Sequence, residues 1–303
     1  MDPLSDVLSL LKLRTFNSGG FDAGGEWAVG FGPHEGIKFH AVAAGACWLA
    51  VDGVPEPMRI HTGDCVLLAR GQPFRAASHQ NLLVNATPLD PSTSQGGITS
   101  RNGGGDFFSV GGYFTLMGAH SAVLLENLPS VVHIRTDPEK AVLRWCLDHM
   151  RQELLVPQVG GFLIAQQLAT MMLIQALRLH LAAGPPNGIC WLSALADKQM
   201  LTAISAMHAD PSHGWTVETL AQRTGMSRTS FSVKFTRTVG FSPMAYLARW
   251  RMMLAADRLT TSADPVSVVA RELGYESETS FSTAFKRIMG SPPRLYSREH
   301  RRL

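Results

Sequence analysis

The chain has 303 residues, of which 45% are hydrophobic and 17% charged, and its formal net charge is +3. This composition is that of an ordinary soluble globular protein of about two domains. The four cysteines, Cys47, Cys65, Cys146 and Cys190, are scattered without a CxxC pair, which excludes a zinc knuckle or a disulfide framework. The most apolar stretch, Met171 to Leu181, is too short and too interrupted to span a bilayer, so we predict a cytoplasmic protein with no membrane partner.

The charge is unevenly distributed along the chain. From Ser193 to the C-terminus, 15 Lys and Arg stand against 9 Asp and Glu, whereas residues 1–192 hold 12 against 15. Cationic side chains gain affinity for DNA by displacing counterions from its phosphates, so a basic C-terminal third is expected of a DNA-binding end. A solvated basic face gives the same signal, and the charge alone does not decide between the two.

Short apolar runs alternate with turn residues over residues 1–135. The residues around Val42, Trp48 and Val51, with a turn at Asp52-Gly53, indicate hairpin strands, and Cys65–Ala69 indicates a buried strand. This half is therefore predicted to be a β-sandwich or small barrel. The stretch 91–106 is rich in Ser, Thr, Gly and Asn and is predicted to be a loop.

Two helices are predicted to follow. Asp137-Pro138 matches a helix N-cap with proline at the first helical position, and a second helix begins after Gly160-Gly161. Its run from Phe162 to Leu181 is apolar on more than one face. We therefore predict a homodimer interface on these helices; the alternative is that they pack only against the sandwich. Residues 185–192 are a predicted linker.

The C-terminal third contains an internal repeat. Gly225, Phe231, Phe235, Gly240, Pro243 and Tyr246 recur about fifty residues later as Gly274, Phe281, Phe285, Gly290, Pro293 and Tyr296. Each copy predicts a short helix, a glycine turn and a second helix, the layout that places a helix in the major groove of DNA. We expect the first unit at about 216–238 and the second at about 265–289. A connecting helix from Pro243 to Leu259, roughly 25 Å long, can hold two reading helices roughly one turn of DNA apart.

The second helix of each unit is expected to have a buried face and a reading face. Phe231 and Phe235 lie four residues apart and must be core. The base-facing candidates are Arg228, Thr229, Ser232 and Val233 in the first unit and Glu278, Thr279, Ser282 and Thr283 in the second. The phosphate candidates are Arg237, Arg249, Arg251, Lys286, Arg287 and Arg294. Because the base-facing residues of the first unit differ from those of the second, the DNA-binding domain of each chain should recognise a directional DNA sequence.

The motifs WTVETLAQRTGMSRTSFSVKF, SPMAYLARWRMMLAADRL, DPVSVVARELGYESETSFSTAFKR and SPPRLY resemble the DNA-binding domain of the AraC/XylS family of bacterial transcription regulators. The resemblance covers roughly Ser193 to Tyr296. It implies that the two readers contact adjacent major grooves of double-stranded DNA, that the domain also touches RNA polymerase, and that the protein is an activator. Relatives often carry a long Arg where this chain has Val233 and Thr283, so readout is expected to use methyl and hydroxyl contacts and Glu278.

The segments PHEGIKFHAVAAGACWLAVDG and GDCVLLARGQPFRAASH resemble the cupin-type sensor half of one AraC subgroup. Cupin enzymes hold a metal through two histidines and a glutamate of the first motif and a histidine of the second. Here the first motif offers only His40, and Phe74 stands at the second position. We therefore expect no metal and no other cofactor, with His34, Glu35, His40, His61 and His79 as separate residues. Trp27, His40, Trp48 and Phe74 are candidates to line a pocket for a small-molecule effector.

Together these patterns predict an α+β chain of two domains. Residues 1–184 form a cupin-like sandwich or barrel (about 1–135) with following dimerisation helices (about 137–182), and residues 193–303 form an all-α domain with two helix-turn-helix motifs joined by a linker helix. The predicted function is a homodimeric transcription regulator under effector control. It is not an enzyme, because the chain has no GxSxG, HExxH, P-loop or strand-linked GxGxxG motif. The alternatives are a metal-binding cupin enzyme or metal sensor fused to a DNA-binding domain, and a ligand-independent dimeric regulator.

Overall fold

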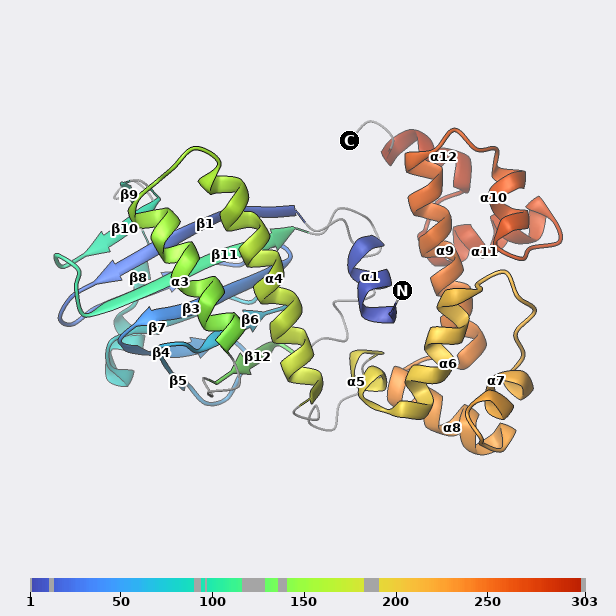
Figure 1. The fold of residues 1–303 in the computed structure, drawn as a ribbon, viewed down its shortest axis with the longest axis horizontal. Coiled ribbons are helices and arrows are strands. Elements are labelled where there is room, and N and C mark those ends of the chain that lie inside the picture. The colour runs from blue at the N-terminus through green and yellow to red at the C-terminus, as the bar shows by residue number, and fades with distance from the viewer. Residues whose placement is uncertain are drawn as a thin grey trace. The chain divides into compact units, whose positions relative to one another are not determined.

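The computed structural model describes residues 2–10, 14–89, 94–95, 97–115, 129–135, 141–182 and 191–300. Their contacts divide them into a β-rich unit, residues 14–115 and 129–182, and a helical unit, residues 2–10 and 191–300 (Figure 1). The two-domain α+β fold class is thus confirmed. The predicted helix start at Asp137-Pro138 and most of the predicted linker lie outside the described residues.

The described strands of the β-rich unit form two sheets. One has the order β12-β6-β3-β11-β1-β10-β9 and the other the order β5-β4-β7-β2-β8. The strands are β1 Arg14–Ala23, β2 Ala28–Phe31, β3 Ile37–Ala44, β4 Ala46–Val51, β5 Met58–His61, β6 Cys65–Leu68, β7 Phe74–Ala77, β8 Thr87–Pro88, β9 Ser94–Gln95, β10 Ile98–Arg101, β11 Phe107–Thr115 and β12 Val131–Ile134, with a 3-10 helix, η1, at Gln80–Asn85. The predicted strands around Val42, Trp48 and Cys65 are all present, but the prediction that 91–106 is a loop is wrong, because it contains β9 and β10, and β10 pairs with β1.

The core of this unit lies between the two sheets. Alternate residues of β4, namely Cys47, Leu49 and Val51, point into it. They meet Val42 of β3 and other residues of the facing sheet, as the twofold period of a strand requires.

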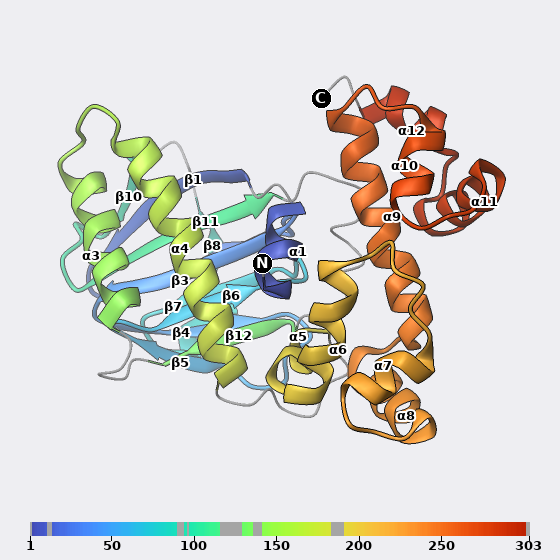
Figure 2. The same cartoon turned by 45° about the vertical axis from the view of Figure 1, so that its right-hand side comes forward.

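Two helices, α3 Ala141–Leu155 and α4 Gly161–Ala182, cover the outer face of the larger sheet (Figures 1 and 2). Among the described helices, α4 alone is long and apolar enough to cross a bilayer by length and composition. It packs against α3, β1 and β12. The side chains that it buries are Ala165, Leu168, Ala169, Met172, Leu173, Ala176 and Leu177. The buried apolar residues of α4 are therefore those expected of a helix that covers a sheet, whereas Phe162, Leu163 and Ile164 at its start are exposed.

The helical unit contains the predicted repeat. Its helices are α1 Pro3–Leu10, α5 Trp191–Ala196, α6 Lys198–Ala209, α7 Val217–Arg223, α8 Arg228–Val239, α9 Pro243–Thr261, α10 Val266–Glu272, α11 Glu278–Met289 and α12 Pro293–His300. The pairs α7–α8 and α10–α11 are the two helix-turn-helix units, and α9 is the connecting helix. In each unit the turn glycine has a positive φ, +68° at Gly225 and +76° at Gly274, a conformation that favours glycine.

Helix α1 departs from the predicted domain boundary. We expected residues 1–184 to form one domain, but α1 packs on α5, α6 and α9 of the helical unit. Leu4 and Val7 are buried there. The Nδ1 atom of His208 lies 3.2 Å from the carboxylate of Asp6, and its Nε2 atom lies 2.8 Å from the hydroxyl of Tyr246. Because a carboxylate only accepts, neutral His208 donates to Asp6 and accepts from Tyr246.

The buried His208 predicts a pH dependence of stability. Burial lowers its pKa from 6.5 to about 4, although the nearby Asp6 opposes this shift. Below pH 6.5 the imidazole of His208 is protonated in the unfolded chain but stays neutral in the folded chain. The free energy of unfolding therefore falls as the pH falls toward 4, by about 1.4 kcal/mol per pH unit for one proton. Urea denaturation between pH 7 and 4.5 measures this slope. We expect His208→Gln to have a slope that is shallower by about one proton; equal slopes would contradict the account.

Candidate nucleic-acid interface

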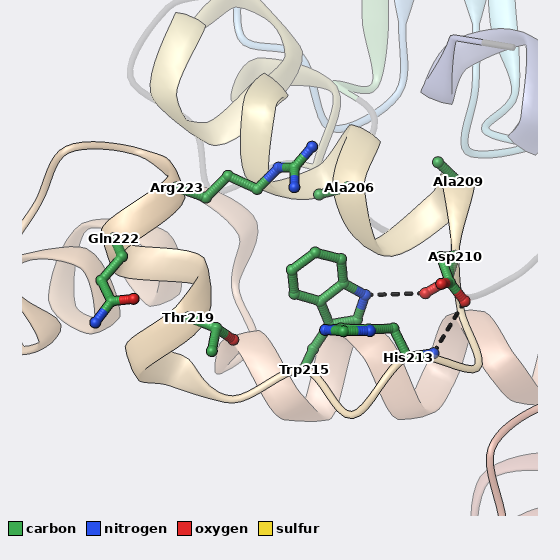
Figure 3. A pocket seen from close by; sticks show the side chains of 8 residues that line it. All are labelled: Ala206, Ala209, Asp210, His213, Trp215, Thr219, Gln222 and Arg223. Carbon is green, nitrogen blue, oxygen red and sulfur yellow. Dashed lines mark hydrogen bonds between the residues drawn. The ribbon is translucent and has the colours of Figure 1, made fainter.

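The first helix-turn-helix unit is fixed by local caps. Thr216 and Thr219 form a reciprocal capping box at the start of α7, and the side chain of Ser227 accepts from the backbone N–H of Ser230 at the start of α8. The loop before α7 is held by Trp215, whose Nε1 atom donates to the Asp210 carbonyl at 2.9 Å (Figure 3). These caps set where the reading helix α8 begins.

Helix α8 has the two faces that the sequence predicts. Phe231 and Phe235 are fully buried, while Arg228 and Thr229 are exposed and Val233 is 62% exposed. Ser232, the fourth candidate of this unit, is half-buried. The four base-facing candidates thus lie off the phenylalanine face, on the side of α8 that is open to solvent.

Lys234 anchors α8 from its other side. Its Nζ atom lies 2.7 Å from the carboxylate of Asp197 and donates at 2.8 Å to the side chain of Gln199. Asp197 is the N-cap of α6. The ion pair therefore holds the reading helix against α6, and Lys234 belongs to the scaffold.

The second unit presents its candidates together. Ser277 caps α11, and Phe281 and Phe285 are fully buried. The exposed side of α11 lines a shallow hollow. Its lining includes Glu278, Thr279, Ser282, Thr283, Lys286 and Arg287. All four base-facing candidates of this unit and two phosphate candidates thus share one open surface.

Glu278 already has a partner on this surface. Its carboxylate lies 3.3 Å from the guanidinium of Arg294, which is exposed. A carboxylate has two oxygens and several acceptor sites, so Glu278 keeps acceptor capacity for a cytosine amino group. Arg294 remains close enough to the reading helix to contact a phosphate beside it.

The other phosphate candidates divide into two groups. Arg237, Lys286 and Arg287 are exposed and form no ion pair within the described part of the chain. The guanidinium of Arg249 lies 4.2 Å from the centre of the Phe241 ring. The first three are therefore available to phosphates, whereas Arg249 also packs on an aromatic ring.

Arg251 has partners within the protein. Its Nε atom donates to the Pro211 carbonyl at 2.5 Å and a terminal nitrogen donates to the His213 carbonyl at 2.9 Å. Its guanidinium also lies 5.7 Å from the Tyr275 ring. These contacts tie α9 to the loop before α7 and to the turn of the second unit. Two of the five N–H donors of Arg251 are thus bound to carbonyls of the first unit, so Arg251 acts as a structural link between the two helix-turn-helix units, and its phosphate contact stays a prediction.

Two family models match the chain, a cupin model over residues 2–182 and a helix-turn-helix domain model over residues 220–299. A putative AraC-like transcription regulator of Streptomyces antibioticus is 41% identical over 305 residues, covering 99% of each chain. The chain belongs to the AraC-type transcription regulators. Further relatives of this AraC-type regulator are AlkR of Acinetobacter baylyi, 31% identical over 99% of this chain and 100% of that protein, and the activator RclR of Escherichia coli, 28% identical over 98% and 99%.

Solved structures of AraC-type proteins are also similar. The DNA-binding domain of AdpA in complex with a target DNA is 31% identical, covers 35% of this chain and 95% of that one, and has a TM-score of 0.33. ToxT of Vibrio cholerae with a bound unsaturated fatty acid is 13% identical, covers 94% of each chain and has a TM-score of 0.38. Membership of the AraC-type regulators rests on the family models and on the relatives of full length. It establishes this chain as a DNA-binding transcription regulator and not an enzyme.

The four effector-pocket candidates of this AraC-type regulator do not come together. Trp27 is buried in the sandwich core, with its ring centre 4.9 Å from that of Phe107. Trp48 alternates with the inward residues of β4 and so lies on the outer face of the smaller sheet, which corrects its assignment to an interior pocket. His40 and Phe74 do meet, with ring centres 5.0 Å apart.

The alternative of a metal site concerns the same region of the sandwich, around His40. Among the described residues, no group of three or more His, Cys, Asp and Glu side chains is placed to hold a metal ion. The half-buried His133 lies 3.1 Å from the buried Asp64, a pair that the sequence does not single out. The residues near His40 are instead Lys38 and His34, and Lys38 was not among the predicted site residues.

The described cysteines are poor candidates for redox sensing. Burial raises the pKa of Cys47 and of Cys65 to about 12, and it raises that of Cys146. All three are free and buried. Because the thiolate is the reactive form, these residues act as small hydrophobic side chains. Cys190 lies outside the described residues.

Proposed function

We propose that this regulator binds operator DNA with α8 and α11 in successive major grooves and activates transcription through contact with RNA polymerase. One observation supports this DNA-binding mode. Helices α8 and α11 each have a solvent-exposed face opposite a corresponding pair of buried phenylalanines, and α9 joins the two units. The name of the E. coli relative, a transcriptional activator, supports the direction of control.

We further propose that a small molecule in the β-rich unit controls this cytoplasmic protein. The support is the pairing of a cupin domain with a DNA-binding domain in one chain. A ligand changes DNA binding or transcription only if it favours one state of the protein over another. The effector is therefore expected to change either the arrangement of the two units or the association of two copies of the chain.

Genomic footprinting of the full-length protein tests the proposed function. We expect protected sites upstream of a small set of promoters, and transcription of the adjacent genes should fall when the protein is removed. Protection without sequence preference would contradict specific binding, and a rise in transcription on removal would contradict activation.

An exposed apolar surface on α3 and α4 supports the predicted homodimer. Its members are Val142, Trp145, Leu155, Val156, Phe162, Leu163 and Ile164, each between 43% and 62% exposed. Exposed large apolar side chains on two neighbouring helices, with Val156 directly after α3, are typical of an interface between proteins. We propose that this surface, called here the α3/α4 patch, joins two copies of the chain.

Leu163→Asp is expected to separate the dimer. Leu163 is 62% exposed and lies in the first turns of α4, within the α3/α4 patch. A charge placed inside an apolar interface loses its hydration without a partner, so dimer affinity should fall by about a hundredfold, from the roughly 3 kcal/mol cost of such a group. Sedimentation velocity measures this change. Val84→Asp is the matched control, because Val84 is 79% exposed on η1, away from the α3/α4 patch; equal dissociation of both variants would contradict the assignment.

A further inference from the structure

A basic cluster lies between the two sheets of the β-rich unit. Ile37, Phe39 and Ala41 of β3 are buried on one face of that strand, so Lys38 and His40 lie on the other. That face is directed toward the smaller sheet, because the His40 ring contacts Phe31 of β2 and Phe74 of β7. The loop that follows β2 adds His34, whose ring centre lies 6.4 Å from that of Phe74. We call His34, Lys38 and His40 the basic cluster.

The ammonium of Lys38 is held against aromatic rings. Its Nζ atom lies 4.6 Å from the ring centre of Phe31 and 4.9 Å from that of Phe74, and these two rings are stacked with centres 4.4 Å apart. Burial lowers the pKa of Lys38. No carboxylate pairs with it among the described residues. The lysine is thus partly desolvated without an anionic partner, which is rarely favourable in itself.

The two histidines have unused hydrogen-bonding atoms. Both ring nitrogens of His34 and the Nε2 atom of His40 are buried and have no hydrogen-bond partner in the protein. Burial, followed by the charge of Lys38, lowers the pKa of His40 to about 3. Buried polar atoms are normally satisfied in folded proteins. Each neutral imidazole carries one N–H, so up to two of these nitrogens are donors, and together with the ammonium of Lys38 they lack an acceptor.

The backbone is shaped to hold these side chains in place. Gly111 of β11 lies opposite His40 in the sheet, and a Cβ atom there would lie 3.0 Å from the imidazole. The backbone N–H of His34 donates to the carbonyl of Gly71 at 3.1 Å. A Cβ atom on Gly71, which has a φ of +68°, would lie 2.3 Å from the His34 carbonyl oxygen. The two glycines therefore leave room for the imidazole of His40 and for the backbone of His34.

We infer that the basic cluster binds the carboxylate of a small organic monoanion, with the stacked rings of Phe31 and Phe74 beside the ligand's apolar part. A carboxylate accepts from an ammonium and from imidazole N–H groups, and so supplies the acceptor that the cluster lacks. A divalent cation is disfavoured because the lysine repels it. The cluster lies beside the loop between β2 and β3, in which Gly32, Pro33 and Glu35 are exposed.

This inference names the chemical class of the proposed effector, and a regulatory role for the carboxylate rests on the proposed function. Binding of a carboxylate is nevertheless measurable without reference to transcription. Ligand binding and DNA binding are therefore recorded separately on the same full-length protein, so that either claim can fail alone. Loss of specific DNA binding would remove the proposed function and leave the carboxylate site standing.

The test is a thermal-shift and calorimetric titration of the full-length protein with aliphatic and aromatic monocarboxylates of two to ten carbons and with their neutral amides. We expect at least one carboxylate to bind, its amide to bind at least about tenfold more weakly, and Lys38→Met to lose about tenfold or more in affinity, the effect of one charge-assisted hydrogen bond. Lys38→Arg should retain binding because it keeps the charge.

Two controls keep the result interpretable. Arg59→Met removes a charge from an exposed position on β5 and should leave affinity unchanged. Lys38→Met without ligand should melt no lower than the unaltered protein, because it removes a desolvated charge. The inference is overturned if no carboxylate of the panel binds, or if the carboxylates bind the Met variant and the unaltered protein equally.

Discussion

Replacing Phe231 by Ala should destabilise the helical unit by about 3 to 5 kcal/mol, the usual cost of removing a buried phenylalanine ring. Phe231 is fully buried, and its ring centre lies 5.6 Å from that of Phe235, which in turn contacts Tyr246 of α9. A loss of this size is a large part of the stability of an ordinary domain. Urea denaturation followed by circular dichroism measures it, and DNA binding should fall with the folded fraction.

Val233→Ala is the matched control for this prediction. Val233 lies two residues further along α8 and is 62% exposed, so its truncation should change stability by no more than about 0.5 kcal/mol. Equal unfolding free energies for the two variants would contradict the division of α8 into a buried face and a reading face. Phe281→Ala should reproduce the loss in the second unit, because Phe281 is also fully buried.

Arg228→Ala and Thr279→Ala should each weaken operator binding by about 1 to 3 kcal/mol, the usual contribution of one specific base contact. Both side chains are exposed at the start of a reading helix, and neither contributes to the buried core. Unfolding free energies should therefore stay the same while binding, measured by fluorescence anisotropy at fixed salt, declines. Thr261→Ala, an exposed threonine at the end of α9, is the control. Unchanged affinity in both reader variants would remove these residues from the interface.

The repeat made much of the helical unit predictable from the sequence. Phenylalanines four residues apart and a following glycine are local signals, and they correctly placed α8, α11 and the connecting helix. The caps that the structure shows at Thr216 and Ser227 are local as well. Local periodicity sufficed because each of these elements buries a face that its own sequence defines.

Three of the differences depend on partners that are distant in the chain. Nothing in the sequence around Asp6 indicates a contact with His208, some 200 residues away, which holds α1 on the helical unit. The sequence predicts a phosphate contact for Arg251 and gives no sign of the two carbonyls, distant in the chain, to which it donates. The sequence does not predict Lys38 as a site residue, because a single lysine in a strand gives no sign of the aromatic rings from two other strands that surround it.

Two different reading helices joined by α9 should recognise a directional DNA sequence. Selection of bound DNA from a random pool, with the unaltered protein, Arg228→Ala and Thr279→Ala, measures this directionality. We expect each domain to select an asymmetric sequence, with the two variants relaxing base preference in segments about one helical turn apart, roughly 10 base pairs. Relaxation of the same base pairs by both variants, or a palindrome within the site of one domain, would contradict the account.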